Sequence, residues 1–209
     1  MNFANPIDIS MSLNDQTLVW VEDDQPELRK VARQPEAPVN FTWLSFGAHA
    51  GTHVDAPYYL FSNKWTADQI PLSRLIGKCQ VLDLTDVEKE ITFADLKNKK
   101  IFQDKILLKT RNSFDPLTEF HQQHISLSKD AAEFLVNLDI KTVGYDYQTF
   151  EPGLSKDNII HNIFLSKDVT LIDNLRLRDT QEKEYFLICL PIKVTGIDAA
   201  PARAVLFEI

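Results

Sequence analysis

Six short runs of apolar and β-branched residues restrict the fold of this chain more than any other feature. Each run is four or five residues long, and some are almost continuously apolar, which is typical of strands that are covered on both faces. The runs lie at residues 80–84, 105–109, 142–145, 169–172, 185–189 and 204–207. This pattern predicts a strand-rich domain whose sheet is covered on both sides.

Two segments between these runs have the spacing of helices. Residues 129–138 carry apolar side chains at helical intervals, and Ser128 can cap that helix. A second helix is predicted over residues 156–166, with Ser155 as its cap. Helices that alternate with strands indicate a mixed α/β fold. The polar stretch 112–124 is predicted to be a loop, and both of its histidines are expected to be exposed.

Length and composition indicate one soluble globular domain. The chain has 209 residues, 44% hydrophobic and 25% charged, and no repeat or linker divides it, so residues 1–209 are predicted to form a single domain. The net charge of −8 argues against a nucleic-acid partner, and no apolar stretch reaches the roughly 18 residues of a membrane span. No signal peptide is visible, and Cys79 and Cys189 are expected to be free thiols, so a cytoplasmic location is predicted.

The segment from His49 to Pro57 carries the residues best suited to chemistry. A helix would place its two histidines on one face, but Gly51 and Pro57 both disfavour a helix. In an extended strand, alternate residues share a face, so His49, His53 and Asp55 would point the same way. Such a set suits Zn²⁺, Mn²⁺ or Fe²⁺, with positions left open for water and substrate. The same residues could instead hydrogen-bond one another in a loop.

This segment, GTHVDAP with His49 before it, resembles the signature of the cyclase family, which includes bacterial kynurenine formamidase and isatin hydrolase. Similar blocks follow in the same order through nearly the whole chain. They lie at residues 8–10, 18–20, 68–77, 127–132, 143–146, 190–193, 196–198 and 201–205. The resemblance implies the family's swivelling β/β/α architecture and a homodimer or homotetramer. Residues 21–40 are expected to reach a neighbouring subunit.

Position by position, the resemblance implies that His49, His53 and Asp55 bind the metal. It also implies a metal-side histidine at His161, in the second predicted helix, and an acidic ligand at Asp173, where the family usually has glutamate. His161 could instead transfer protons, and without the resemblance it would be interpreted as a surface or capping residue. Because aspartate is one methylene shorter than glutamate, we expect one tightly held metal and a weak or absent second.

One position departs from the family pattern. Hydrolytic members carry a catalytic histidine two residues after the proline of the motif, and here Tyr59 occupies that place. A phenol titrates near pH 10 and an imidazole near 6.5, roughly, so an unperturbed tyrosine is a poor base at pH 7. Tyr59 is expected to assist catalysis or orient the substrate, and packing at the pocket mouth is the alternative.

The predicted function is metal-dependent hydrolysis or cyclisation at the carbonyl of an amide, formamide, imide or lactone. Tyr59 or His161 would assist proton transfer. The resemblance implies that Trp20 lies on the substrate side, and Phe46 and Trp65 could add apolar walls for a small aromatic substrate. The alternative is a metal-binding pseudoenzyme that acts as a ligand-binding or interaction protein, because the family's catalytic histidine is missing.

Overall fold

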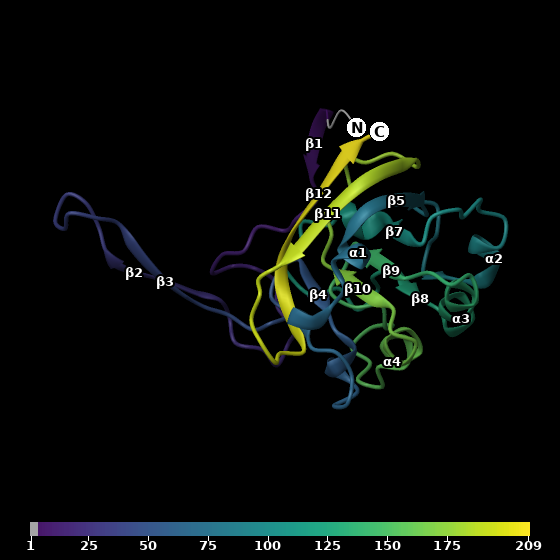
Figure 1. Cartoon of the computed structure of the whole chain (residues 1–209), viewed down its shortest axis with the longest axis horizontal. Coiled ribbons are helices and arrows are strands. Elements are labelled where there is room, and N and C mark those ends of the chain that lie inside the picture. Colours follow the sequence, from purple (N-terminus) through teal and green to yellow (C-terminus); the bar gives the residue numbers. More distant parts are fainter. Residues whose placement is uncertain (1–3) are drawn as a thin grey trace.

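The computed structural model describes residues 4–209, and its main feature is a sheet that closes on itself (Figure 1). Its strands are β1 (Ala4–Asp8), β4 (His53–Asp55), β5 (Ile76–Asp83), β7 (Lys105–Lys109), β9 (Thr142–Tyr145), β10 (Thr170–Asp173), β11 (Glu184–Pro191) and β12 (Ala199–Glu208). Within the described chain, seven of them follow the order β12-β11-β5-β7-β9-β10-β4, and β4 pairs again with β12. This last pairing closes the barrel-like ring, and β1 pairs with the far end of β12.

Helices cover one side of this sheet. The strands β5, β7, β9 and β10 run parallel, whereas β11, β12 and β4 complete the ring through antiparallel pairings. Parallel neighbours need crossover connections, and these contain α2 (Phe93–Leu96), α3 (Lys129–Asn137) and α4 (Ile159–Ser166). The remaining short elements are α1 (Leu72–Leu75), η1 (Pro57–Tyr59), η2 (Ala67–Gln69), η3 (Arg111–Phe114) and the paired strands β6 (Glu90–Ile91) and β8 (Ser126–Leu127). No helix within residues 4–209 has the length and apolar character needed to cross a membrane.

Two apolar clusters form the core, one on each side of the closed sheet. The inner cluster takes side chains such as Val54, Val81 and Leu206 from strands around the ring. The outer cluster joins side chains of the sheet, such as Ile106, to side chains of α3 and α4, such as Phe164. Because alternate residues of a strand face opposite sides, burial on both sides explains the almost continuous apolar runs of the sequence.

The predicted elements are present, and the strand-rich α/β fold is confirmed. Strands β7 and β9 have the predicted bounds. Helix α3 begins after Ser128, whose hydroxyl accepts a hydrogen bond from the Ala131 N–H. Helix α4 begins at Ile159 rather than at residue 156, and the predicted cap at Ser155 is wrong. Its first flanking residue is Asn158, which has a left-handed backbone with φ of 49°.

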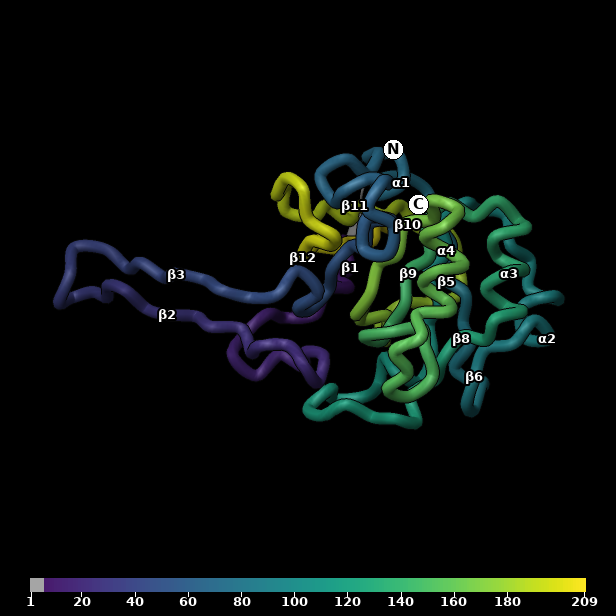
Figure 2. The backbone as a smooth tube through the Cα atoms, turned by 90° about the horizontal axis from the view of Figure 1, so that it is seen from below, coloured from purple at the N-terminus to yellow at the C-terminus, as the bar shows by residue number. Residues whose placement is uncertain are grey.

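Residues 27–45 form a hairpin arm that projects away from the barrel (Figures 1 and 2). The arm consists of β2 (Glu27–Ala32) and β3 (Phe41–Ser45), which pair antiparallel. Within the described residues this pair has no third strand. The sequence predicts that residues 21–40 reach a neighbouring subunit, but it does not predict these two strands.

Candidate metal centre

Strand β4 and helix α4 bring the candidate ligands together. Val54 belongs to the inner cluster, so its neighbours His53 and Asp55 point to the outer face of the sheet. On the adjacent strand β10, Asp173 lies directly opposite His53. Helix α4 packs beside β10 and contributes His161. The predicted placement of Asp173 at the end of a strand is confirmed.

His49 reaches the same place from a bend. Residues 49–52 are not extended, and Gly51 has a φ of +65°, a conformation that strains any other residue type. The predicted strand over residues 49–55 is therefore wrong in its first half and holds only for His53–Asp55. The side chains converge nevertheless, because the bend at Gly51 turns His49 back so that its ring centroid lies 5.0 Å from that of His53.

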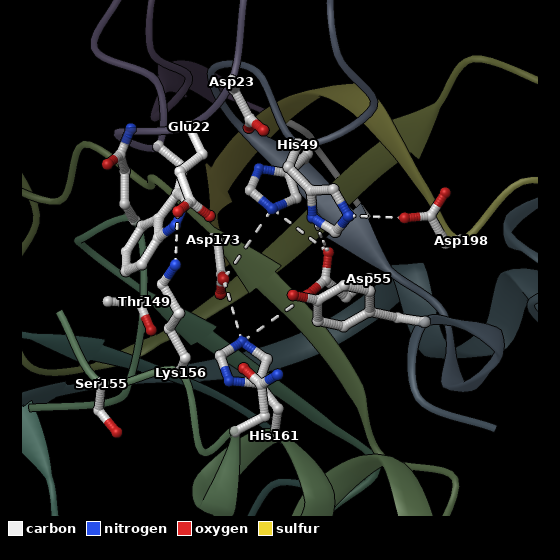
Figure 3. Close-up of a pocket in the computed structure, with 15 residues that line it drawn as sticks. Glu22, Asp23, His49, Asp55, Thr149, Ser155, Lys156, His161, Asp173 and Asp198 are labelled. Atoms are coloured by element: carbon white, nitrogen blue, oxygen red, sulfur yellow. Dashed lines mark hydrogen bonds and ion pairs between the residues drawn. The ribbon is translucent and has the colours of Figure 1, made fainter.

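The side chains form two triads that share Asp55 (Figure 3). In the first triad, Asp55 Oδ1 lies 3.1 Å from His49 Nδ1 and 3.3 Å from His53 Nε2. In the second, His161 Nε2 lies 3.8 Å from Asp55 Oδ2 and 3.8 Å from Asp173 Oδ2. The candidate ligand atoms of each triad lie within 4.8 Å of one another. All five residues are buried except His49, which is partly exposed.

The second ring nitrogen of each histidine has an oxygen acceptor outside the triads. The N–H groups donate from His49 Nε2 to Asp198 Oδ2 (2.8 Å), from His53 Nδ1 to the Gly51 carbonyl (2.9 Å) and from His161 Nδ1 to Glu151 Oε1 (3.1 Å). Each ring therefore directs its other nitrogen toward the shared carboxylates, which is the usual orientation of histidines around a protein-bound metal.

Two of these acceptors were not assigned a role from the sequence. Asp198 lies in one of the blocks that resemble the cyclase family, and its place in that block is the sequence signal that marks it. Glu151 lies in the loop between β9 and α4, and no local spacing pattern links it to His161.

The electrostatics of the cluster favour a bound cation. Although burial opposes ionisation of Asp55, His49 and His53 hold its pKa well below the ordinary value, whereas burial raises the pKa of Asp173. Burial alone would lower the pKa of His49 and His161, but the neighbouring carboxylates raise both to about 10. At neutral pH the rings of His49 and His161 therefore carry protons at the positions where a metal could bind.

The carboxylates also have unused acceptor atoms. Oδ1 of Asp173 is buried and has no hydrogen-bond donor among the described residues, and Oδ1 of Asp55 faces only the ring nitrogens of His49 and His53. A buried carboxylate oxygen without a donor is costly unless a cation neutralises it. The three imidazoles and two carboxylates supply the nitrogen and oxygen donors that suit Zn²⁺ or Mn²⁺. The residues present therefore fit a divalent metal.

Tyr59 lies at the wall of a cleft that opens from the cluster. The cleft has a volume of about 390 Å³. Tyr59 belongs to η1, and its ring centroid is 4.8 Å from that of His49 and 6.1 Å from that of His161. Burial, with the charges of Asp55 and Asp173, raises the pKa of Tyr59 to about 12. The phenol therefore keeps its proton at neutral pH and can donate a hydrogen bond into the cleft.

The rim of the cleft joins the N-terminal segment to the loop before α4. Trp20 lines the cleft and packs edge-on against Phe120, with centroids 5.3 Å apart. Glu22 and Lys156 form an ion pair across the rim (Figure 3). The predicted apolar walls at residues 46 and 65 are not among the described residues that line the cleft.

The predicted exposure of the loop histidines is wrong for His124. Its side chain is buried and stacks on Tyr147, with ring centroids 4.2 Å apart. Its two nitrogens contact the carbonyl oxygens of His121 and Glu151. His121 is partly exposed, as expected, and contacts Asp115. Neither histidine lines the cleft in the part of the chain that the structure describes.

The closed sheet and the histidine–carboxylate cluster define a strand-rich α/β protein with a candidate metal centre on the outer face of the sheet. Comparison with known proteins then places the chain in a family. A family model described as "Putative cyclase" matches residues 7–152, and this chain belongs to that cyclase family.

Individual relatives agree with this assignment. The kynurenine formamidase of Erythrobacter litoralis is 31% identical over 97% of this chain and 93% of that protein. The kynurenine formamidase of Salinibacter ruber is 30% identical over 96% of each. A solved structure described as "The Structure Of Potential Metal-Dependent Hydrolase With Cyclase Activity" is 32% identical over 98% of both chains, with a TM-score of 0.87. An isatin hydrolase bound to thioisatinate has a TM-score of 0.84 over 97% of this chain and 92% of that one, but its 19% identity supports the fold alone.

Proposed function

We propose that this chain is a metal-dependent hydrolase that acts on the carbonyl of a small amide, formamide, imide or lactone. The observation that carries the proposal is the pair of triads sharing Asp55 at the base of a cleft. The residues proposed to hold a divalent metal, Zn²⁺ or Mn²⁺ with Fe²⁺ as a further option, are His49, His53, Asp55, His161 and Asp173. The kynurenine formamidases among the relatives support cleavage of a non-peptide C–N bond.

The chain's own residues would orient the substrate and control its protons. A bound divalent cation supplies Lewis-acid polarisation of a carbonyl and lowers the pKa of water. Tyr59, whose raised pKa keeps it protonated, would donate a hydrogen bond to the oxygen that gains negative charge. His161 is in position to move a proton wherever it is not held by the metal.

An aromatic substrate would suit the outer part of the cleft. Trp20 supplies an apolar ring at the rim, whereas Glu22, Asp23 and Lys156 surround it with charge. A flat substrate could lie against Trp20 with its carbonyl directed toward the cluster.

The arm supports a homodimer. Phe41, Trp43 and Leu44 are each at least 42% exposed. Cross-strand pairing places Trp43 opposite Arg29, on one face of the arm, and Leu44 opposite Leu28, on the other. Isolated two-stranded hairpins are at best marginally stable in water, so both apolar faces need a cover. The arm carries Arg29, Lys30 and Arg33 against Glu27 and Glu36, while the whole chain has a net charge of −8. The arm thus has a net charge of +1, and its exposed apolar side chains are the main support for pairing with a second copy.

Metal analysis and a substrate panel test the proposed function together. Purified protein should retain a divalent metal, and His53→Ala should lose it, because one ligand of a small set is removed. His121→Ala is the matched control, because His121 is a partly exposed histidine outside the cleft, and this variant should keep the metal. Equal metal content in wild type and His53→Ala would overturn the metal assignment. Metal retention without turnover of any aryl formamide, cyclic imide or lactone would favour the ligand-binding pseudoenzyme.

A further inference from the structure

We propose that Glu151 is a positioning residue that fixes the ring of His161 in the candidate metal centre. The proposal rests on the proposed function, because it assigns His161 a place beside the metal. Glu151 is buried, and its Oε1 accepts hydrogen bonds from the backbone N–H groups of Ile160 (2.8 Å) and His161 (3.1 Å). The same oxygen accepts from His161 Nδ1 at 3.1 Å.

Glu151 caps the N-terminus of α4, which is usually done by the residue immediately before a helix. An asparagine in that position is well suited to cap a helix through its side chain, but Asn158 is left-handed and makes no such cap. Two free N–H groups in the first turn of α4, those of Ile160 and His161, therefore bond to Glu151 instead. One carboxylate oxygen thus holds both the backbone of the helix and the ring that projects from it.

This double attachment decides which nitrogen of His161 is available. Because Nδ1 donates its hydrogen to Glu151, Nε2 is the nitrogen that faces Asp55 and Asp173. A carboxylate behind an imidazole also strengthens the opposite nitrogen as a ligand. The other two anchors differ: Asp198 is substantially solvent-exposed, and the Gly51 carbonyl carries no net charge. Among the three anchors, Glu151 alone is both ionisable and buried.

The loop that carries Glu151 is itself held in place. The Glu151 carbonyl accepts a hydrogen bond from His124 Nε2 at 2.8 Å, and its N–H donates to Thr149 Oγ1 at 3.1 Å. His124 stacks on Tyr147 of the segment after β9. These contacts restrict the backbone of Glu151, and through its side chain the direction of His161.

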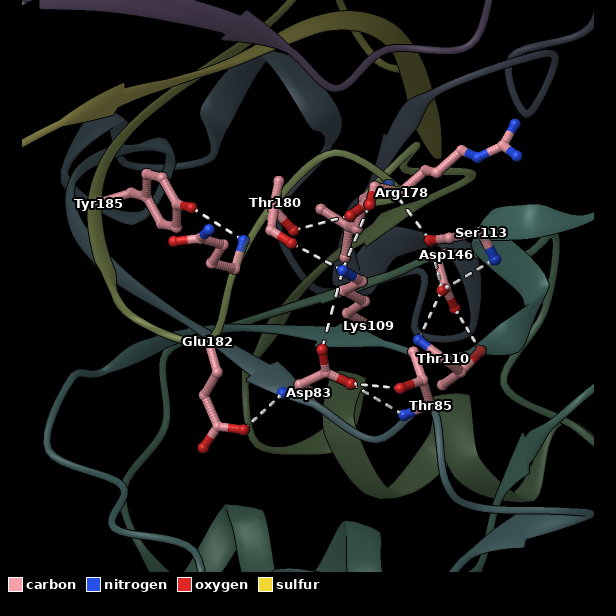
Figure 4. Close-up of polar contacts among 12 residues, drawn as sticks. Asp83, Thr85, Lys109, Thr110, Ser113, Asp146, Arg178, Thr180, Glu182 and Tyr185 are labelled. Carbon is pink, nitrogen blue, oxygen red and sulfur yellow. Dashed lines mark hydrogen bonds and ion pairs between the residues drawn. The ribbon is translucent and has the colours of Figure 1, made fainter.

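Three variants separate positioning from simple helix capping. Glu151→Ala removes both attachments, whereas Glu151→Gln keeps an acceptor oxygen and removes the charge. Asp146→Asn is the matched control, because Asp146 is also a buried carboxylate that accepts backbone N–H groups, from Thr110 (2.6 Å) and Ser113 (3.1 Å), but it does not line the cleft (Figure 4). Zn²⁺ affinity is measured by competition with a chromophoric chelator, at a temperature where circular dichroism shows each variant folded.

If Glu151 positions His161, Zn²⁺ affinity falls roughly 10–100-fold in Glu151→Ala and by less in Glu151→Gln. Asp146→Asn loses thermal stability but stays within about twofold of wild-type affinity. Wild-type affinity in both Glu151 variants, with a lower thermal midpoint, would reduce Glu151 to a helix cap and overturn the proposal. If Glu151→Ala does not fold, the Zn²⁺ affinity of Glu151→Gln alone tests the proposal.

A second readout distinguishes failure of this proposal from failure of the proposed function. Wild-type protein that binds no metal would contradict the function, and the ring hydrogen bond can then be followed directly. Proton NMR should show a protected imidazole N–H signal that disappears in His161→Ala, which assigns it, and also in Glu151→Ala. Persistence of that assigned signal in Glu151→Ala, or its absence from wild type, would overturn the positioning role.

Discussion

Tyr59 faces His49 and His161 with a phenol that stays protonated, so the catalytic role proposed for it can be tested by deleting one oxygen. Tyr59→Phe keeps the ring packing against His49. If the hydroxyl stabilises the developing oxyanion, turnover of the best carbonyl substrate should fall about 10²–10³-fold, with metal content unchanged. Steady-state kinetics together with elemental analysis check this. Turnover in Tyr59→Phe equal to wild type would assign the ring a packing role only.

Gly144 permits close packing inside the closed sheet. A Cβ at this position would lie 2.4 Å from Leu107 Cδ2 and 2.6 Å from Leu175 Cδ1. Both leucines are fully buried, so Gly144→Ala should lower the free energy of unfolding by about 1–3 kcal/mol through overpacking. Urea unfolding measures it. Gly47→Ala is the control, since a Cβ there meets nothing within 4 Å. A loss as large in Gly47→Ala would contradict the packing explanation.

At the residue level, the sequence predicted most residues of the cluster but not how they are arranged. The motif placed His49, His53 and Asp55 together because they are close in sequence, and the resemblance to the cyclase family added His161 and Asp173. Glu151 could not be found in this way. It meets His161 only because the loop after β9 folds back over the start of α4, and the spacing of residues does not encode that fold.

The pairing of β1 with β12 includes an ion pair whose contribution depends on pH. Arg203 donates to both carboxylate oxygens of Asp8. Although burial opposes it, hydrogen bonds from Arg203 and Ser10 lower the pKa of Asp8 below its ordinary 3.8. A lowered pKa in the folded state contributes stability above about pH 4 that is lost as the pH falls. Because both side chains are exposed, Arg203→Gln should cost less than about 1 kcal/mol at pH 7.

Urea unfolding at several pH values checks this. The difference between wild type and Arg203→Gln should shrink as the pH falls below 4. A difference that grows toward acid would contradict the assignment. Lys129→Gln serves as a control, since its pairing with Glu133 in α3 is also exposed but does not join β1 to β12.

The arm allows a test of oligomeric state. Replacing Phe41 and Leu44 with serine removes one large exposed side chain from each face of the hairpin. If the arm binds a second copy, wild type should be a dimer in light scattering coupled to gel filtration, and the double variant a monomer. Phe102→Ser, an exposed phenylalanine outside the arm, is the control and should stay dimeric. A dimeric double variant would exclude the arm as the main interface.

Local sequence patterns do not predict the strands of the arm, and they do not predict the short strand β4 with its true bounds. Strands β7, β9 and β10 were predicted because burial on both faces makes their sequences almost continuously apolar. Strands β11 and β12 alternate between buried and partly exposed residues, and their apolar, β-branched composition predicted them. The strands of the arm lie outside that core, so their sequences mix charged and apolar residues without a clear period. Strand β4 has only the three residues His53–Asp55, and its pairing with β10 and β12 depends on residues far along the chain.

Removal of a bound metal should lower the stability of the whole fold, because the cluster joins β4, β10 and α4. A ligand present at 100 times its dissociation constant stabilises the folded state by about 2.7 kcal/mol. Chelation should therefore lower the thermal midpoint of wild type, and added Zn²⁺ should restore it. His53→Ala should unfold at the lower temperature and not respond to chelator. An equal chelator effect on His53→Ala would point to a different cation site.

The pairing of β4 with β12 determines how late during synthesis the sheet can close. His53 leaves the ribosome early, whereas its cross-strand partners Asp173 and Pro201 are among the later residues to be translated. At about 5–20 residues per second, the interval between Asp55 and Pro201 lasts about 7–30 s. During that time the first histidines of the motif have no second triad and no closed sheet around them. If the cluster holds an ion, loading of the complete site would therefore follow translation, and the newly made protein would compete for the ion with other chelators.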